Sequence, residues 1–434
     1  MKKENTLKNS LVLLYTTMVL CVFGLQFTTQ ASNVFQEPLQ GIQTINEFKG
    51  HVYDSSSKDA LAYVDINITG TNISTITNKE GAFLLKVPTE YLNKTIKISL
   101  LGYAEGEIEI SSLKIDDNKI YLDLSITQLS NVNVYGIKNA EALVRAALNR
   151  KSEVYDNNRT KMTAFYRETI KKRNKNASLS EAVLAVYKQP YTNSKSDELS
   201  LLKSRKSTDY SRLDTLTLKL QGGPFSTLYT DIIKYPEYIF NKNDLSNYVF
   251  TFDESTQLNN RLVYVVNFKQ KVNNDEPLYY GKLYIDSQTL ALTSAIYNLN
   301  ISNKELASKM FVRKKPFNAR VYPTVAAYRV DYRTRNGKWY YGYGKIELTF
   351  KVNYKRKLFN NVYTLNCEMA ITDWKIDDNS KLVGEKLKPN VVIIDKASGF
   401  SDPEFWGEYN IIEPEKSIEN AIQKINKQLE DAES

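Results

Sequence analysis

Short runs of alternating apolar and polar side chains between residues 62 and 124 most constrain the fold of this chain. The first run places Val64, Ile66 and Ile68 at every second position. Runs with the same period follow at 96–100, 107–110 and 120–124. A period of two sends alternate side chains to opposite faces of a pleated strand. Short strands separated by turn residues therefore predict an antiparallel β-sandwich.

The turns between these runs carry their own signal. Residues 78–81 have the sequence Asn-Lys-Glu-Gly. Asparagine bonds its own backbone in tight turns, and Gly81 can take a positive φ at no steric cost. We predict a tight turn at this point, between two strands of the sandwich.

The motifs of residues 48–136 resemble the carboxypeptidase-regulatory-like domain. The resemblance is carried, in chain order, by residues 50–54, 62–71, 77–85, 100–103 and 129–135. It implies a seven-stranded, transthyretin-like β-sandwich that performs no chemistry itself, since this domain accompanies catalytic and transport domains. It also implies a cell-envelope setting and leaves the activity open.

The first 31 residues predict a secretory signal peptide. Lys2, Lys3 and Lys8 precede an apolar run over residues 11–27, and the small residues up to Ala31 suit a signal peptidase. We expect cleavage after Ala31, then a linker over residues 32–47. The expected location is the periplasm, the outer membrane or the cell surface.

Two rival interpretations of this segment stay open. The run could remain as a membrane anchor, although polar residues interrupt it and it is short for a spanning helix. A lipoprotein signal would use Cys21, but Leu20 precedes that cysteine where a small residue is needed. No later segment has the roughly 20 consecutive apolar residues that a spanning helix needs.

The charge of the chain is modestly positive. It has 58 lysines and arginines against 49 acidic residues, a formal net charge of +9. The positive charges are spread, with small clusters at residues 171–173 and 313–315. They indicate a solvated surface first, and attraction to anionic lipid or polysaccharide second. No nucleic-acid motif accompanies them, so nucleic acid is not an expected partner.

Residues 137–160 predict a linking helix, with Asn139 as the N-cap and an apolar stripe behind it. A second, β-rich domain of unknown function is expected over residues 161–434. Its later strands are expected at 248–252, 262–268, 282–285, 292–297, 326–332, 338–352, 362–374 and 391–394. The polar stretch 191–211 predicts an exposed loop. An amphipathic helix is expected over residues 414–430, packed on the sheet.

The predicted fold class is thus mainly β: a sandwich, then a larger antiparallel β-rich α+β domain with a linking helix and a C-terminal helix. Short turns such as Asn336-Gly337 favour antiparallel order. The motifs at 165–168, 222–224, 281–286 and 405–410 resemble exported Bacteroidota proteins whose second region has no established activity. The hairpin at 281–298 also resembles lipoprotein-carrier half-barrels, which hold acyl chains in an apolar concavity.

Histidine content restricts the chemistry. His51 is the only histidine in the chain, and it stands in the first predicted strand of the sandwich. A two-histidine zinc site and a Ser-His-Asp triad are therefore not expected. Cys367 would be the only cysteine left after signal cleavage, and its strand-like context predicts a small buried role. We assign no catalytic, cofactor-binding or metal-binding residue.

Two weaker signals remain. A carboxylate pair would suffice for a glycosidase, and the candidate acids by position are Glu168, Glu181, Asp231, Asp286 and Glu347. Trp339, Tyr341 and Tyr343 alternate along one predicted strand and are expected on one face. Such a row packs in a core more often than it contacts a ligand, but it is the best candidate for stacking on sugars or lining a lipid groove.

Three functions follow as hypotheses. The first is a non-enzymatic exported protein of the cell envelope that binds or assembles with an envelope protein, lipid or polysaccharide. The second is a lipid- or glycan-binding protein that uses a concave face of the second domain. The third is a carboxylate-pair hydrolase. The sequence does not distinguish the partner, the oligomeric state or the membrane face.

Overall fold

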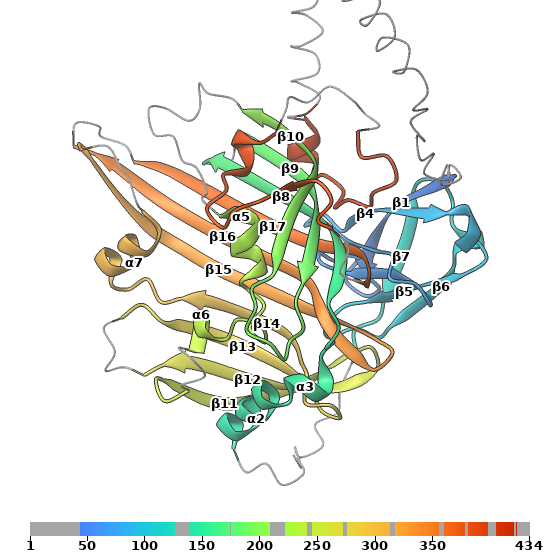
Figure 1. Ribbon diagram of the computed structural model, residues 1–434, viewed down its shortest axis with the longest axis horizontal. Coiled ribbons are helices and arrows are strands. Elements are labelled where there is room, and N and C mark those ends of the chain that lie inside the picture. The colour runs from blue at the N-terminus through green and yellow to red at the C-terminus, as the bar shows by residue number, and fades with distance from the viewer. Residues whose placement is uncertain are drawn as a thin grey trace, which may run out of the picture. The chain divides into compact units, whose positions relative to one another are not determined.

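The computed structural model describes residues 44–125, 139–173, 175–208, 222–240, 245–271, 276–312, 317–355, 360–377, 381–397, 405–420 and 422 (Figure 1). The predicted signal peptide, most of the linker after it and most of the predicted C-terminal helix lie outside these residues. No helix within the described ranges is both long and apolar enough to cross a membrane.

The first element is a seven-stranded β-sandwich, as predicted. Its strands are β1 (Ile45–Asp54), β2 (Asp65–Ile68), β3 (Ser74–Ile76), β4 (Ala82–Pro88), β5 (Thr95–Ser99), β6 (Gly106–Glu109) and β7 (Asn118–Leu122), with 3-10 turns at Thr89–Tyr91 and Ile110–Ser112. They form two sheets, ordered β4-β1-β7 and β3-β2-β5-β6. The pairs are antiparallel except β1 with β7. The alternating apolar side chains meet between the sheets, where Val52, Ile66 and Ile98 are fully buried.

The predicted turn before β4 is confirmed. Gly81 has φ +76°, and a Cβ at this residue would lie 2.8 Å from the Val52 carbonyl oxygen. The side-chain oxygen of Asn78 accepts hydrogen bonds from the backbone N–H groups of Glu80 (2.9 Å) and Ala82 (3.0 Å). Only glycine fits this conformation and this close approach.

The linking segment contains helices α2 (Ala140–Asn149) and α3 (Lys151–Val154). The predicted N-cap is confirmed, because the Asn139 side chain accepts a hydrogen bond from Ala142 N–H at 2.7 Å. The apolar stripe of α2, which includes Leu143 and Val144, is buried against the large sheet near β11 (Figure 1).

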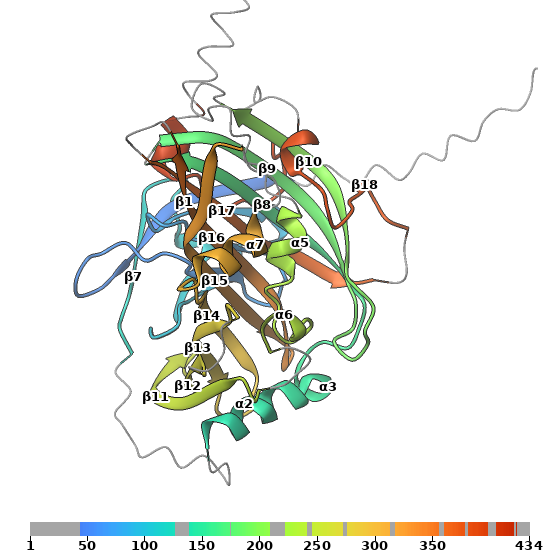
Figure 2. The same ribbon diagram turned by 90° about the vertical axis from the view of Figure 1, so that its left-hand side faces the viewer.

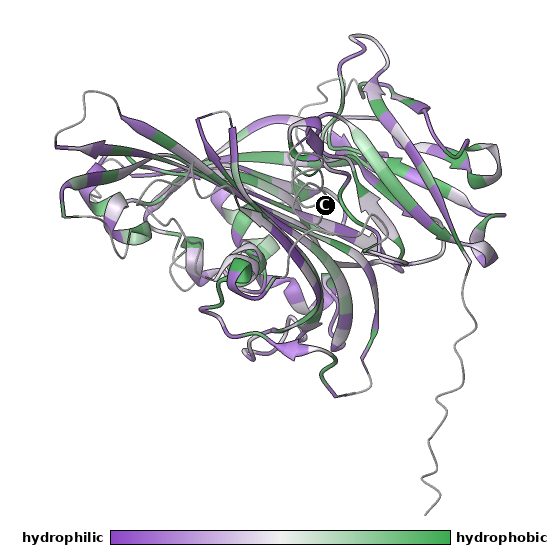
Figure 3. Cartoon of the chain, turned by 90° about the horizontal axis from the view of Figure 1, so that it is seen from above, coloured by the Kyte–Doolittle hydropathy of each residue, from purple (hydrophilic) through white to green (hydrophobic). Residues whose placement is uncertain are grey.

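The region after the linking segment is built on one sheet of eleven antiparallel strands. They are β8 (Thr160–Lys172), β9 (Lys175–Lys188), β10 (Glu198–Thr208), β11 (Tyr248–Leu258), β12 (Arg261–Gln270), β13 (Tyr279–Asp286), β14 (Leu292–Leu299), β15 (Ala319–Arg335), β16 (Lys338–Tyr354), β17 (Asn361–Ile376) and β18 (Glu385–Lys386). The order is β11-β12-β13-β14-β15-β16-β17-β8-β9-β10-β18, and the sheet is strongly curved (Figures 2 and 3). The antiparallel prediction is confirmed.

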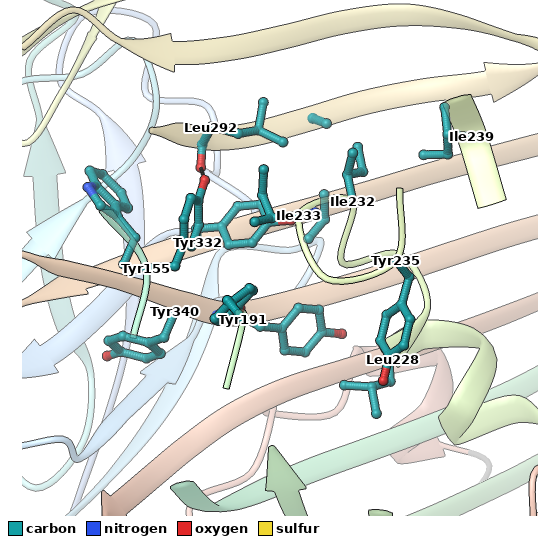
Figure 4. Packing of buried hydrophobic residues seen from close by; sticks show 14 of the residues in the cluster. Tyr155, Tyr191, Leu228, Ile232, Ile233, Tyr235, Ile239, Leu292, Tyr332 and Tyr340 are labelled. Atoms are coloured by element: carbon teal, nitrogen blue, oxygen red, sulfur yellow. Dashed lines mark hydrogen bonds between the residues drawn. The ribbon is translucent and has the colours of Figure 1, made fainter. Parts of the chain in front are cut away.

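The concave face of this sheet is filled by the chain itself. Residues 222–240, which contain α5 (Gly223–Leu228) and α6 (Glu237–Phe240), lie inside the curve (Figure 2). We call them the plug segment. Leu228, Ile232 and Ile233 are buried against sheet tyrosines, including Tyr332 (Figure 4). The predicted concavity is therefore occupied by a packed core.

The convex face carries the sandwich and the C-terminal segment. Ile76 and Leu84 of the sandwich share one apolar cluster with Phe165 of β8 and with Trp406 and Ile412. Arg167 on β8 donates a hydrogen bond to the Ile412 carbonyl at 2.7 Å. The C-terminal segment thus packs against both the sandwich and the sheet. Its helical turn over residues 416–420 begins two residues after Pro414.

Two local predictions were wrong. The polar stretch 191–211 contains strand β10, in which Leu199 and Ser200 are fully buried. Its polar side chains find partners in the sheet, such as Arg205 with Glu181 of β9 at 2.9 Å. Residues 391–394 do not form a strand, since Val391 and Val392 are irregular and a 3-10 turn begins at Ile393. The sequence also did not predict the plug helices or α7 (Lys304–Phe311).

Candidate functional site

A cavity of about 510 Å³ lies between the sandwich and the large sheet. Its walls come from the outward faces of β2 and β5 on one side and from strands β14 to β16 on the other. The tip of the β11–β12 hairpin, residues 258–261, closes one end. Ligand cavities measure roughly 300–1,000 Å³, so this one has the size of a small-molecule site.

Strand β15 supplies a row of charges to the cavity. Arg329, Asp331, Arg333 and Arg335 occupy every second position and therefore project to one face. Arg329 Nε donates to Asp331 Oδ2 at 2.6 Å. The pKa of Arg329 is raised: burial lowers it, but the Asp331 carboxylate more than offsets this. Arg329 therefore stays charged.

Arg333 joins the sheet to the sandwich. It forms an ion pair with Asp65 of β2, and its Nη1 donates to Ser74 Oγ of β3 at 2.6 Å. It also donates to the carbonyl of Ile371 on β17. Burial raises the pKa of Asp65, and the Arg333 guanidinium opposes that rise. This contact fixes one side of the cavity to the other.

The sandwich wall is polar. Asn67 of β2 and Lys97 of β5 face each other across the strand pair, with Ser99 two residues further along β5. Lys97 Nζ pairs with Glu105 at 2.9 Å, and this hydrogen bond raises the Lys97 pKa. These positions are the polar half of the alternation that the sequence showed.

The hairpin wall is held in place by hydrogen bonds to the sandwich. The backbone carbonyl of Gln257 accepts a hydrogen bond from Gly102 N–H at 2.8 Å. Its side-chain oxygen accepts a hydrogen bond from the Ser125 hydroxyl at 2.6 Å. Glu105 N–H donates to Asn260 Oδ1 at 3.2 Å. The cavity is thus enclosed by three parts of the chain that are tied to one another.

The three predicted ligand-contact aromatics separate. Trp339 and Tyr343 line the cavity, whereas the Tyr341 hydroxyl donates to the Thr227 carbonyl of the plug segment at 3.0 Å. The expectation that all three share a face was wrong, because a β-bulge shifts the register between Tyr341 and Tyr343: Tyr341 pairs with Tyr332, but Tyr343 pairs with Asp331. Trp339 and Tyr341 keep one register and share the core of the concave face, whereas Tyr343 turns to the sandwich side. A ligand role for Trp339 and Tyr343 stays a prediction.

All three of these aromatics are buried, with 2%, 0% and 1% of their surface exposed for Trp339, Tyr341 and Tyr343. Among the described residues, the Trp339 indole N–H has no hydrogen-bond partner. A buried N–H of this kind normally finds an acceptor. Trp339 lines the cavity, but this N–H is itself buried and does not face the cavity.

The five candidate acids do not converge, and none lines the cavity. Glu347 lies 3.6 Å from Lys79, and Asp286 caps the turn after β13 by accepting from Thr289 N–H at 2.7 Å. Glu181 pairs with Arg167 and Arg205, whose charges hold its pKa below the usual range against the effect of burial.

The other two candidates lie on the concave face. Asp231 pairs with Lys188 at 2.6 Å, and Lys188 also binds Asp197 at 2.7 Å. Glu168 accepts from the Tyr166 hydroxyl at 2.9 Å, and burial raises its pKa to about 7. Each carboxylate has its own local partner in the fold.

Neither His51 nor a metal-type cluster lies at the cavity. His51 is on β1, where its ring stacks with Tyr53 at 5.9 Å between centroids. Within the described ranges, no three His, Cys, Asp or Glu side chains gather as a metal site would require. Cys367 is buried, as predicted.

The sequence did contain a signal for the missed site. Between residues 328 and 333, Arg and Asp alternate with Tyr and Val. The apolar set, such as Val330 and Tyr332, faces the plug segment, and the charged set faces the sandwich. A strand with charges at every second position and apolar residues between them indicates one polar face. What covers that face depends on long-range contacts.

Three solved structures have weak similarity to this chain. A DUF1329 family protein from Desulfovibrio piger is 10% identical and has a TM-score of 0.24, with 56% of this chain and 96% of that chain covered. A LolA superfamily protein from Nitrosomonas europaea is 9% identical with a TM-score of 0.18, covering 56% and 95%. Lipovitellin, in a structure that describes lipid–protein interactions, is 5% identical with a TM-score of 0.27. TM-scores this low do not indicate a shared fold.

The match to lipovitellin covers 53% of this chain and only 27% of that protein. No curated protein matches the sequence. One family model matches residues 48–134, a range that contains strands β2 to β7 and β1 from Phe48 onward. The structure gives the described part of this range, residues 48–125, the sandwich that the motifs predicted. Residues 48–134 of this chain are a CarboxypepD_reg-like domain.

Proposed function

We propose that this protein is an exported, non-enzymatic binding protein of the cell envelope, and that its ligand site is the cavity between the sandwich and the large sheet. The observation that carries the proposal is the cavity itself: about 510 Å³, lined by charged and polar side chains from both parts of the chain. Ligand sites have volumes in this range, and they use a few precisely placed polar groups to orient the ligand.

Preorganised walls support a binding role. The Arg333–Asp65 ion pair and the hydrogen bonds of Gln257 to the sandwich hold the walls in place without a ligand. The C-terminal segment adds a third tie, because Asn410 accepts from Lys86 N–H of β4 at 2.7 Å. A preorganised site spends less of its interaction energy on ordering side chains and loops during binding.

The partners of the acidic residues also favour binding over hydrolysis. Asp65, Glu105 and Asp331 line the cavity, and each pairs with a cationic side chain. A glycosidase needs one carboxyl that is held protonated to act as the acid. Of the candidate acids, Glu168 has a pKa of about 7, but it lies on the concave face away from this cavity.

The setting in the proposal comes from the N-terminal sequence. Basic residues before the apolar run and small residues up to Ala31 are typical of a secretory signal. A chain with a single cysteine after residue 31 forms no internal disulfide, so packing must stabilise it outside the cell. The large core of the second domain supplies such packing.

A thermal-shift screen of the mature chain tests the proposal. Oligosaccharides, peptides, nucleotides and lipids are screened against the wild type, Ser99→Trp and Ser111→Trp. Ser99 lines the cavity, whereas Ser111 is exposed elsewhere on the sandwich. We expect at least one class to raise the melting temperature of the wild type and of Ser111→Trp, but not of Ser99→Trp. The proposal would be contradicted by ligands that raise the melting temperature of Ser99→Trp as much as that of the wild type. Hydrolysis of a glycan or peptide by the protein would also contradict it.

A further inference from the structure

The charge of the cavity restricts its ligand. Five cationic side chains line it against three acidic ones. The three acids neutralise Lys97, Arg329 and Arg333 within the cavity. The surplus of positive charge therefore comes from the other two cations, Arg261 and Arg335.

Neither of these two arginines has a close acid in the cavity. Arg335 donates to neutral acceptors of the sandwich, the Gly70 carbonyl at 3.1 Å and the Asn72 side chain. Arg261 reaches Asp286 only at 3.8 Å and is 38% exposed. Guanidinium groups bind carboxylate, phosphate or sulfate with charge-assisted, bidentate hydrogen bonds. The ligand is expected to carry an acidic group.

Aromatic rings in the cavity lining leave little free surface on which a flat ligand could stack. The Tyr63 ring is covered by Arg329 and by Lys345, each 4.7 Å from its centroid. Tyr340 packs on Trp374 with ring centroids 4.9 Å apart. Because these faces are occupied, a nucleobase or another heteroaromatic group finds little stacking surface in the cavity.

The remaining lining suits hydroxyl groups. It offers the amide of Asn67 and the hydroxyls of Ser99 and Thr334. Amides and hydroxyls both donate and accept hydrogen bonds, as a sugar hydroxyl does. An acyl chain would instead leave these buried polar groups and the charged pairs unsolvated, which is costly.

Building on the proposed function, we infer that the cavity binds an acidic saccharide. Its hydroxyl groups meet the amide and hydroxyl groups of the lining, and its acidic group meets Arg335 or Arg261. This ligand chemistry depends on the cavity being the binding site.

Isothermal titration of the mature chain tests the inference with three probes of similar length: trigalacturonate, cellotriose and triglutamate. We expect trigalacturonate to bind at least about tenfold more tightly than either other probe. Cellotriose lacks the acidic group, and a good charge-assisted pair contributes on that scale. Triglutamate has acidic groups but lacks the sugar hydroxyls that the polar lining would bind. Its affinity should fall with added salt. Arg335→Gln should weaken it by about tenfold, and Arg335→Lys by less.

Thermal melts show whether Arg335→Gln is folded. If it is not, Arg261→Gln is the variant that tests the contribution of an arginine to binding. Equal binding of triglutamate would overturn the inference in favour of a simple polyanion site. Equal binding of cellotriose would overturn it in favour of neutral sugar. If none of the three probes bound, acidic saccharides would be rejected as the ligand class. The proposed function would still hold if the thermal-shift screen found another ligand whose binding Ser99→Trp abolishes. If no ligand of any class lost its binding in Ser99→Trp, both the acidic-saccharide inference and the proposed function would be rejected.

Discussion

Arg333 on β15 and Asp65 on β2 form an ion pair across the boundary between the large sheet and the sandwich. Arg333 is 8% exposed, and Asp65 keeps 24% of its side-chain surface in contact with solvent, through the cavity. The same guanidinium donates to Ser74 and to the Ile371 carbonyl. One side chain thus ties strands that are far apart in the sequence.

We predict that Arg333→Met destabilises the protein by about 3 kcal/mol, the lower end of the cost of breaking a buried pair, because Asp65 is left without its cation but retains some solvent. Urea unfolding measures the change. Arg320→Met is the matched control, since Arg320 is an exposed residue of the same strand. It should change stability by less than about 0.5 kcal/mol. Equal effects of the two substitutions would contradict this account of the contact.

A second prediction concerns Lys188, which is 2% exposed and binds the carboxylates of Asp197 and Asp231. Lys188→Met leaves two buried carboxylates without a cation and should cost about 3–5 kcal/mol. Adding Asp231→Asn removes one of those charges, so the double variant should be more stable than Lys188→Met alone. Urea unfolding of both variants checks this order.

The exposed residue Lys309 gives the control, and Lys309→Met should leave stability nearly unchanged. Lys188→Met should also gain stability as the pH falls, since protonation removes the uncompensated charge. If the double variant were less stable than the single one, the destabilisation would come from lost packing and not from unpaired charge.

The sandwich was predictable because its signals are local. Alternation such as that of Val64, Ile66 and Ile68, and a turn such as that at Gly81, depend on neighbours a few residues away. The family motifs added the strand number. Strand β10 was missed for the opposite reason, because its polar residues are buried only through partners such as Glu181 on another strand.

The candidate site was less predictable than the fold. The sequence identified Trp339 and Tyr343, which line the cavity, but it did not reveal the bulge that places Tyr343 on the face opposite Tyr341. The charged face of β15 was visible as a pattern. This charged face lies against the polar side of the sandwich because distant parts of the chain contact each other, as Gly102 contacts Gln257. A cavity between two parts of a chain has no local signature.

A third prediction concerns pH. Burial raises the pKa of Glu168 from the ordinary 4.5 of a glutamate to about 7, so the folded state binds a proton more tightly than the unfolded state. Stability from this group is complete below pH 4.5 and is lost as the pH rises through 7. The loss amounts to about 3 kcal/mol, because each tenfold difference in proton affinity between the two states corresponds to about 1.4 kcal/mol.

Glu168→Gln tests this, because its amide oxygen still accepts from Tyr166 but does not ionise. The free energy of unfolding, measured in urea from about pH 4.5 to about pH 8, should fall more steeply for the wild type than for Glu168→Gln. The other titrating groups are common to both proteins and cancel in the difference. Glu305→Gln, at an 83% exposed residue of α7, should track the wild type. Parallel pH profiles for wild type and Glu168→Gln would refute a raised pKa at this residue.

The last prediction concerns the concave face and the lipid hypothesis. The plug segment packs Leu228, Ile232 and Ile233 against the sheet, and Tyr341 donates to the Thr227 carbonyl. An acyl chain would have to displace this segment and forfeit roughly 1.5–3 kcal/mol for each large apolar side chain that it exposes. The Lys188–Asp231 pair, which also holds the segment, would have to separate.

Native mass spectrometry of the mature protein should therefore give the mass of the polypeptide alone, and organic extraction should release no stoichiometric lipid. Lys188→Met, which weakens the hold on the plug segment, is the variant to compare for lipid uptake from phosphatidylethanolamine vesicles. Uptake by that variant alone would show that the segment occludes an apolar surface able to hold lipid. Stoichiometric lipid in the wild type would show that the plug segment yields to acyl chains, and would restore the concave face as the binding site.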